Sequence, residues 1–286
     1  MRRHVVPAFL DFDYRANILR EEISDAWDDA VKETHRVSRA QLISGLQEQY
    51  GVRDTDRMVA DFIAAGPLVS SVIAHHNVFL RQVRDAFVAG NYYPALTGGC
   101  ALGERTLNHL LLDLREDFRT SAEYKRVYRK ESFQDWELAI STLEAWNVLV
   151  PEAAAAFREL ATLRHRSLHF NPETYLSLRD DALAAITALA VVVQRQFAAF
   201  GVCPWFIEGT AGICFIKKEW EENPFIRKYY LPLCPRVGFL YAWGTDRGWR
   251  VFDFERYEGE REITDEEFRY LYNSRDPKAC APTDTV

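Results

Sequence analysis

The chain has 286 residues, of which 48% are hydrophobic and 27% charged, the balance of a soluble globular protein. Lys and Arg number 35 against 42 Asp and Glu, giving a net charge of −7 that excludes a generally basic nucleic-acid coat but allows a local basic groove. No apolar run reaches the ~18 residues of a membrane-spanning helix, and the five scattered cysteines contain no Cys-x-x-Cys pair. We therefore expect no membrane segment, zinc knuckle or disulfide framework, and a reduced, cytoplasmic compartment.

Apolar residues at helical spacing predict helices from about residue 11 to about residue 200. Gly51 marks the end of one helix, and Pro67 and Pro151 fit the first turns of two others. Asn171 and Pro172 supply an N-cap and a first-position proline for a last long helix. The expected helices cover residues 14–30, 41–50, 67–90, 94–114, 135–149, 151–168 and 172–200.

After Gly201 the pattern changes to short runs of β-forming residues separated by Pro, Gly and Asp. Residues 245–248 read as a hairpin turn, and Thr264 as the cap of a short final helix. The strands are expected at residues 213–216, 229–233, 237–243 and 249–254. The chain is thus predicted to be mainly α, with a helical domain over residues 1–200, a small β-containing domain over 201–275 and a flexible tail over 276–286. The second domain is rich in aromatic residues. We expect either a small sheet with an aromatic core or a sensor or substrate-docking module.

The segment Arg164-His165-Arg166-Ser167-Leu168-His169 concentrates cationic and imidazole side chains just before the last helix. Backbone N–H groups and the positive dipole at a helix start favour a phosphate. Imidazole can move a proton near neutral pH, and a guanidinium can stabilise charge on phosphate oxygens. The alternative is a charged helix end, since Arg and His are common near helix C-termini.

The spacing from Arg164 to His169 resembles the Arg-x4–6-His motif of HEPN ribonucleases. The residue after the arginine in that family is often Asn, Asp or His, which His165 matches. The motif also precedes the last long helix of an all-α bundle, and residues 93–110 resemble the upstream HEPN helix. Asn171 stands where one toxin subgroup carries a tyrosine two places after the histidine, so a tyrosine-modifying antitoxin is not indicated.

The resemblance implies an HEPN-like helical bundle that cuts RNA without a metal or other cofactor. His169 would deprotonate the ribose 2′-OH, Arg164 would stabilise the phosphorane, and His165 would orient or share the proton transfer. The products would be a 2′,3′-cyclic phosphate and a 5′-OH. It also implies a homodimer whose two motifs share one cleft, in a toxin or antiviral defence effector with a possible antitoxin or defence-system partner. The competing hypothesis is a non-catalytic HEPN-like scaffold that binds a nucleotide, RNA or a protein.

Two further groups of polar residues are candidates for RNA contact. Glu104 and Asn108 share a helix face, as do Arg105 and His109, so these four could line the cleft opposite the motif or brace the bundle interior. A basic stretch with interleaved tyrosines could grip phosphates and stack bases, or form a solvated linker. Its basic residues are Lys125, Arg126, Arg129 and Lys130.

Overall fold

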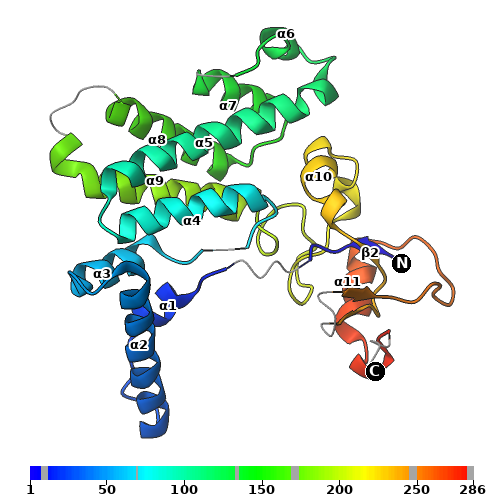
Figure 1. Ribbon diagram of the computed structural model, residues 1–286. Coiled ribbons are helices and arrows are strands. Elements are labelled where there is room, and N and C mark those ends of the chain that lie inside the picture. The colour runs from blue at the N-terminus through cyan, green and yellow to red at the C-terminus, as the bar shows by residue number, and fades with distance from the viewer. Residues whose placement is uncertain (8–11, 69, 133–134, 169–173, 245–249, 282–286) are drawn as a thin grey trace. The chain divides into compact units, whose positions relative to one another are not determined.

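The backbone divides near residues 9 and 197 into two units in this computed structural model (Figure 1). One unit comprises Leu10–Phe197, and the other joins Met1–Phe9 to Ala198–Val286. The structure describes residues 1–7, 12–68, 70–132, 135–168, 174–244 and 250–281. No helix within these ranges is long and apolar enough to cross a membrane.

The first unit is helical, as expected from the sequence, and no strand occurs among its described residues between 70 and 197. Helix α5 is its central element, because α5 packs against α4, α7, α8 and α9 (Figure 1). The helices are α1 (Arg15–Arg20), α2 (Asp29–Tyr50), α3 (Thr55–Ala65), α4 (Ala74–Val88), α5 (Tyr92–Leu114), α6 (Tyr124–Val127), α7 (Trp136–Ala145), α8 (Pro151–Leu168) and α9 (Thr174–Gln196), with a 3₁₀ turn η1 (Arg115–Phe118) after α5.

Close packing of α5 against α8 requires a residue without a side chain. A Cβ atom on Gly103 would lie 2.9 Å from Cδ1 of Leu160 in α8 and 3.2 Å from the ring of Trp136 in α7. Leu107, Leu110 and other apolar residues of α5 are buried around this point. Glycine at position 103 therefore sets how closely α8 can approach α5.

The single helix expected over residues 14–30 is wrong, as is the separate short helix over 41–50. Helix α1 ends at Arg20, and α2 runs from Asp29 to Tyr50, where Gly51 ends it as expected. Between them the Ser24 hydroxyl accepts a hydrogen bond from the backbone of Ala26. Serine competes in this way for backbone groups that a continuous helix would use.

The start expected at Pro67 is also displaced, because α4 begins only at Ala74. The backbone N–H of Leu68 bonds the carbonyl of Asp13, and that of Val72 bonds the carbonyl of Phe197. These tertiary hydrogen bonds take donors that a helix from Pro67 would have used. In contrast, α8 spans residues 151–168 as predicted, and Asp135 caps α7 by accepting from Leu138 N at 3.0 Å.

The second unit contains two short antiparallel strand pairs and a few short helices. Strand β1 (Arg3–His4) pairs with β2 (Arg236–Val237), so Met1–Phe9 belongs to this unit, whereas the expected division at residue 200 places it with the helical domain. Strand β3 (Ala242–Gly244) pairs with β4 (Arg250–Phe252), and the turn expected at 245–248 lies outside the described residues. The other elements are η2 (Lys218–Trp220), α10 (Pro224–Tyr229), η3 (Leu231–Leu233), α11 (Asp265–Ser274) and η4 (Pro277–Ala279).

Two of the expected strands are not strands. Residues 229–233 belong to the end of α10 and to η3, because Asn223 caps α10 and Pro224 fits its first turn. Residues 213–216 form only isolated bridges, with Val5 and with Phe206. The segment expected as a flexible tail is bonded at least as far as Ala281, whose N–H donates to the Leu240 carbonyl at 2.7 Å.

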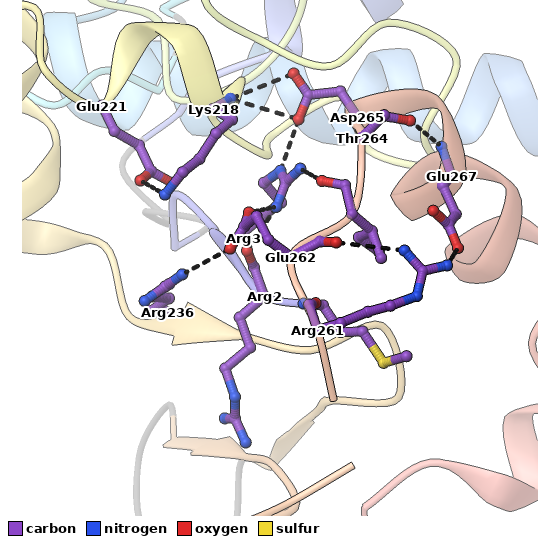
Figure 2. A network of polar contacts seen from close by, with 12 residues as sticks. Arg2, Arg3, Lys218, Glu221, Arg236, Arg261, Glu262, Thr264, Asp265 and Glu267 are labelled. Carbon is purple, nitrogen blue, oxygen red and sulfur yellow. Dashed lines mark hydrogen bonds and ion pairs between the residues drawn. The ribbon is translucent and has the colours of Figure 1, made fainter. Parts of the chain in front are cut away.

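Arg3 ties the N-terminal segment to the start of α11 (Figure 2). Its fully buried guanidinium contacts Asp265 at 2.6 Å and Glu262 at 3.2 Å, and it donates to the Ile263 carbonyl at 2.5 Å. Thr264 caps α11 as predicted by accepting from Glu267 N at 3.2 Å. The hydrophobic core of this unit is largely aromatic. It comprises Phe215, Tyr241, Phe268 and Tyr272 with Val5, Ile207, Val237 and Ile263.

Candidate functional site

The Arg-x4-His motif lies at the C-terminal end of α8. Arg164 and His165 are in the last two turns of that helix, Arg164 half-buried and His165 exposed. His169, the proposed base, and the Asn171-Pro172 cap lie outside the described residues. The structure therefore describes the arginine part of the predicted site and its surroundings.

The structure brings Glu104 of α5 next to Arg164 of α8. Glu104 Oε2 lies 2.8 Å from Arg164 Nε, and the two side chains are 24% and 30% exposed. The pairing follows from the close helix contact, because Leu160 is one turn before Arg164 and packs at Gly103, the residue before Glu104. Glu104 thus reaches the motif, as the sequence allowed.

Glu104 is the one described residue that forms an ion pair with the Arg164 guanidinium. Among the described residues, Nη1 and Nη2 donate no hydrogen bond. These two nitrogens are the ones that hold a phosphate or carboxylate in the end-on bidentate geometry. Arg164 is therefore paired with Glu104 and has two further nitrogens that can donate to an anion.

Cys100 lies one turn before Glu104 and is buried near the motif. Burial raises the pKa of its thiol to about 11, although Ser167 and the charge of Arg164 both oppose that rise. The thiol is thus neutral near pH 7, when the thiolate is the reactive form of cysteine. Cys100 therefore packs beside the motif as a neutral thiol.

The other three proposed cleft residues do not join Arg164. Asn108 donates a hydrogen bond to the Glu104 carbonyl at 2.8 Å, within α5. Arg105 lies with its guanidinium carbon 5.5 Å from the ring centre of Phe79 in α4, and the His109 ring meets His76 of α4 at 5.3 Å. The two faces predicted for this helix therefore contact different neighbours, since Glu104 points toward α8 while Arg105 and His109 point toward α4.

The basic stretch lies in and after the short helix α6. Val127 is its buried anchor, and the predicted RNA-contacting residues Lys125, Arg126, Arg129 and Lys130 are all exposed. The guanidinium carbon of Arg129 lies 5.0 Å from the ring centre of Tyr128. Glu104 is ten residues from Leu114, the last residue of α5, which is about 15 Å along the helix axis at 1.5 Å per residue. The basic stretch comes after η1, so it follows the end of α5 that lies away from Glu104.

Arg166, the other arginine of the motif segment, has a different partner. It forms an ion pair with Asp181 of α9, a buried carboxylate that also accepts from Ser177 at 3.0 Å. This contact joins α8 to α9. Arg166 therefore braces the helices on either side of the motif, which the sequence alone does not reveal.

A buried carboxylate that the sequence analysis missed joins α3 to α5 and α9. Asp61 is fully buried, and its oxygens lie 2.8 Å from Arg57 Nη1 and 2.7 Å from Arg179 Nη2. Tyr92 donates to it at 2.7 Å. The Arg57–Asp61 spacing of four residues was the available signal, but Arg179 is 118 residues away in sequence.

No group of three His, Cys, Asp or Glu side chains in the described part of the chain is arranged to hold a metal ion. Comparison with protein-family models, curated proteins and solved structures finds no match to this chain.

Proposed function

We propose that this protein is a metal-independent endoribonuclease of the HEPN type. The observation that carries the proposal is the half-buried Arg164, whose Nε lies 2.8 Å from Glu104, the one ion-pair partner of its guanidinium among the described residues. An arginine placed in this way is suited to bind phosphate oxygens and to stabilise the charge that develops on them during transfer.

The chemistry assigns one role to each residue of the motif. His169 removes the proton from the ribose 2′-OH, and the oxygen attacks the adjacent phosphorus while the bond to the 5′-oxygen breaks. Arg164 holds the phosphorane, and His165 orients or shares the proton transfer. Since an in-line transfer needs an acid opposite the base, a homodimer with both motifs in one cleft supplies the second imidazole. The exposed Lys125, Arg126, Arg129 and Lys130 then extend the contact to the RNA backbone.

The competing function is a non-catalytic scaffold for RNA, a nucleotide or a protein. One observation favours it: the carboxylate of Glu104 lies against Arg164 and offsets part of its charge, which weakens its attraction for phosphate. The net charge of −7 acts in the same direction. The two functions differ in whether RNA is cut.

Incubation of the purified chain with total RNA in EDTA separates these two functions. The ribonuclease gives fragments with 2′,3′-cyclic phosphate ends, and His169→Ala and Arg164→Ala abolish or strongly reduce them. Arg158→Ala is the matched control, because Arg158 is on the same helix and pairs with Glu137 and Glu144 away from the motif. Intact RNA across several substrates, together with normal bacterial growth on expression, would exclude the enzyme and leave the scaffold.

The shared cleft has its own test. Mixing the Arg164→Ala and His169→Ala variants produces heterodimers that keep one copy of each residue, and these should regain part of the activity. A monomeric, fully active protein would rule out the dimeric site while leaving the ribonuclease assignment intact. A bacterial toxin or antiviral defence effector should also slow growth on expression, and the Arg164→Ala variant should not.

A further inference from the structure

A pocket of about 560 Å³ lies in the helical unit. The residues that line it fall between Phe12 and Val88, far in sequence from the motif at Arg164. Its walls come from α1 and the residues before it, the end of α2, and parts of α3 and α4, and none comes from α5 or α8. Its size is within the range of small-molecule sites. Phe12, Ile18 and Phe62 form an apolar wall, and Arg15 and Arg84 are among its charged residues.

Arg84 of α4 is the unusual residue of this pocket. Its side chain is buried, at 7% exposed, and its one hydrogen bond to a described residue goes to the backbone carbonyl of Gly66. Its Nε atom is buried with no partner. A buried guanidinium without a carboxylate partner is costly, so this arrangement is suited to an anion that completes it.

The two carboxylates near Arg84 are already engaged by other groups. Asp13 is held by Arg15, with 2.8 Å between Oδ2 and Nη2, and Asp85 accepts a hydrogen bond from the Tyr50 hydroxyl at 2.5 Å. Burial lowers the pKa of Arg84 even though both carboxylates act to raise it. The nearby acids therefore favour the charged form of Arg84 without forming an ion pair with it.

The charges of the wall limit the charge of the ligand. Arg84 shares this wall with two aspartates, Asp13 and Asp85. A ligand with a single negative charge meets less repulsion from these carboxylates than a ligand with two. A phosphate monoester, with a charge of about −1.5 to −2 at pH 7, would be repelled more strongly by both aspartates.

The apolar wall indicates the rest of the ligand. The Phe12 side chain is 47% exposed, and its ring lies 5.3 Å from that of Tyr14 at an angle of 52°. Phe62 is 2% exposed and its ring faces the guanidinium carbon of Arg15 at 5.2 Å, so Phe12 supplies the accessible ring. An exposed aromatic ring favours contact with another planar ring.

We propose that this pocket binds a small aromatic monocarboxylate, whose carboxylate accepts hydrogen bonds from Arg84 and whose ring packs against Phe12 and Ile18. The pocket shares no residue with the Arg164 site, so the proposal does not depend on ribonuclease activity. The ligand is defined by its chemistry, one negative charge on a planar apolar body.

Benzoate, benzamide and phenyl phosphate are suitable probes for calorimetric titration of the full chain. Benzoate should bind and raise the melting temperature, and benzamide, which has the same shape without the charge, should bind at least tenfold more weakly. Phenyl phosphate should also bind more weakly than benzoate. Absence of benzoate binding at roughly 10 mM, or tighter binding of benzamide or phenyl phosphate, would overturn the proposal.

Variants then locate the site. Arg84→Met removes the charge while keeping the length and should weaken benzoate binding at least tenfold. Phe12→Ala, at an exposed position that the fold does not depend on, should weaken it severalfold even if Arg84→Met fails to fold. Arg158→Met is the control and should bind as the unaltered chain does. Unchanged binding in the Phe12 variant, or in a folded Arg84 variant, would place the carboxylate elsewhere and refute the proposal.

Discussion

The contact between Glu104 and Arg164 predicts that Glu104 acts through the arginine. In the Glu104→Ala variant the Arg164 guanidinium loses its ion-pair partner, but Nη1 and Nη2 can still bind a phosphate. We expect the rate of RNA cleavage to fall about tenfold, which corresponds to about 1.4 kcal/mol of transition-state stabilisation. Arg164→Ala removes the phosphate contact itself, and its expected loss is roughly 10²–10³-fold, as for removal of an oxyanion donor.

The size of the structural effect follows from the exposure of the pair. An exposed ion pair contributes about 0.2–1 kcal/mol and breaking a buried one costs about 3–5 kcal/mol. Glu104 and Arg164 are 24% and 30% exposed at 2.8 Å, which places their coupling near 1 kcal/mol. Urea unfolding of the two single variants and the double variant measures this coupling directly.

The same double-mutant cycle applied to RNA cleavage tests the positioning role. If Glu104 acts through Arg164, the double variant should cleave no more slowly than Arg164→Ala alone, because the second change has nothing left to misplace. Glu137→Ala is the matched control, since Glu137 pairs with Arg158 on the same helix α8. A double variant tenfold slower than Arg164→Ala would show that Glu104 acts independently, and would refute the reasoning.

Three further outcomes are expected from the rest of the structure. Asp61→Asn should lower the free energy of unfolding by about 3 kcal/mol, or roughly 6–12 °C in melting temperature, while Asp180→Asn, an exposed contact of the same Arg179, should change it by less than about 0.5 kcal/mol. Burial raises the pKa of Cys100 to about 11, so the folded state holds the thiol proton more tightly than the unfolded state. Stability should therefore decline between about pH 9 and pH 11, by up to about 3 kcal/mol for this thiol. Urea unfolding of Cys100→Ala should show a smaller decline over that range, and an identical decline would contradict the assignment. Gly238→Ala places a Cβ 2.2 Å from the Tyr257 ring, and thermal unfolding should show a loss of roughly 1–3 kcal/mol unless Tyr257→Ala makes room.

Local signals predicted the helix that carries the motif. Pro151 marks the start of α8 and apolar spacing continues to residue 168, so its bounds could be read from sequence. The i,i+4 spacing also showed that Glu104 and Asn108 share one face and that Arg105 and His109 share another. Periodicity says which residues share a face, but not which neighbour packs there, so it could not show that Glu104 meets Arg164.

Two of the wrong expectations, the helix start at Pro67 and the strand at 213–216, have a common physical cause in hydrogen bonds between segments distant in sequence. Leu68 bonds Asp13 instead of starting a helix, and the segment expected as a strand at 213–216 makes only bridges, one of them to Val5. The N-terminal strand Arg3–His4 pairs more than 230 residues away, with Arg236–Val237. Local propensity carries no information about such pairings, and tertiary context overrides it.

The Arg164 environment shows how a packing contact can determine a chemical one. Gly103 allows Leu160 to approach α5. Arg164 is one helical turn after Leu160 on the same face of α8, and its side chain therefore contacts the Glu104 carboxylate. The guanidinium is therefore placed by the α5–α8 interface. A site built on two packed helices holds its side chains more firmly than one built on loops. The proposed ribonuclease would thus carry its phosphate-binding group on the rigid part of the bundle, with the direction of its outer nitrogens fixed before RNA arrives.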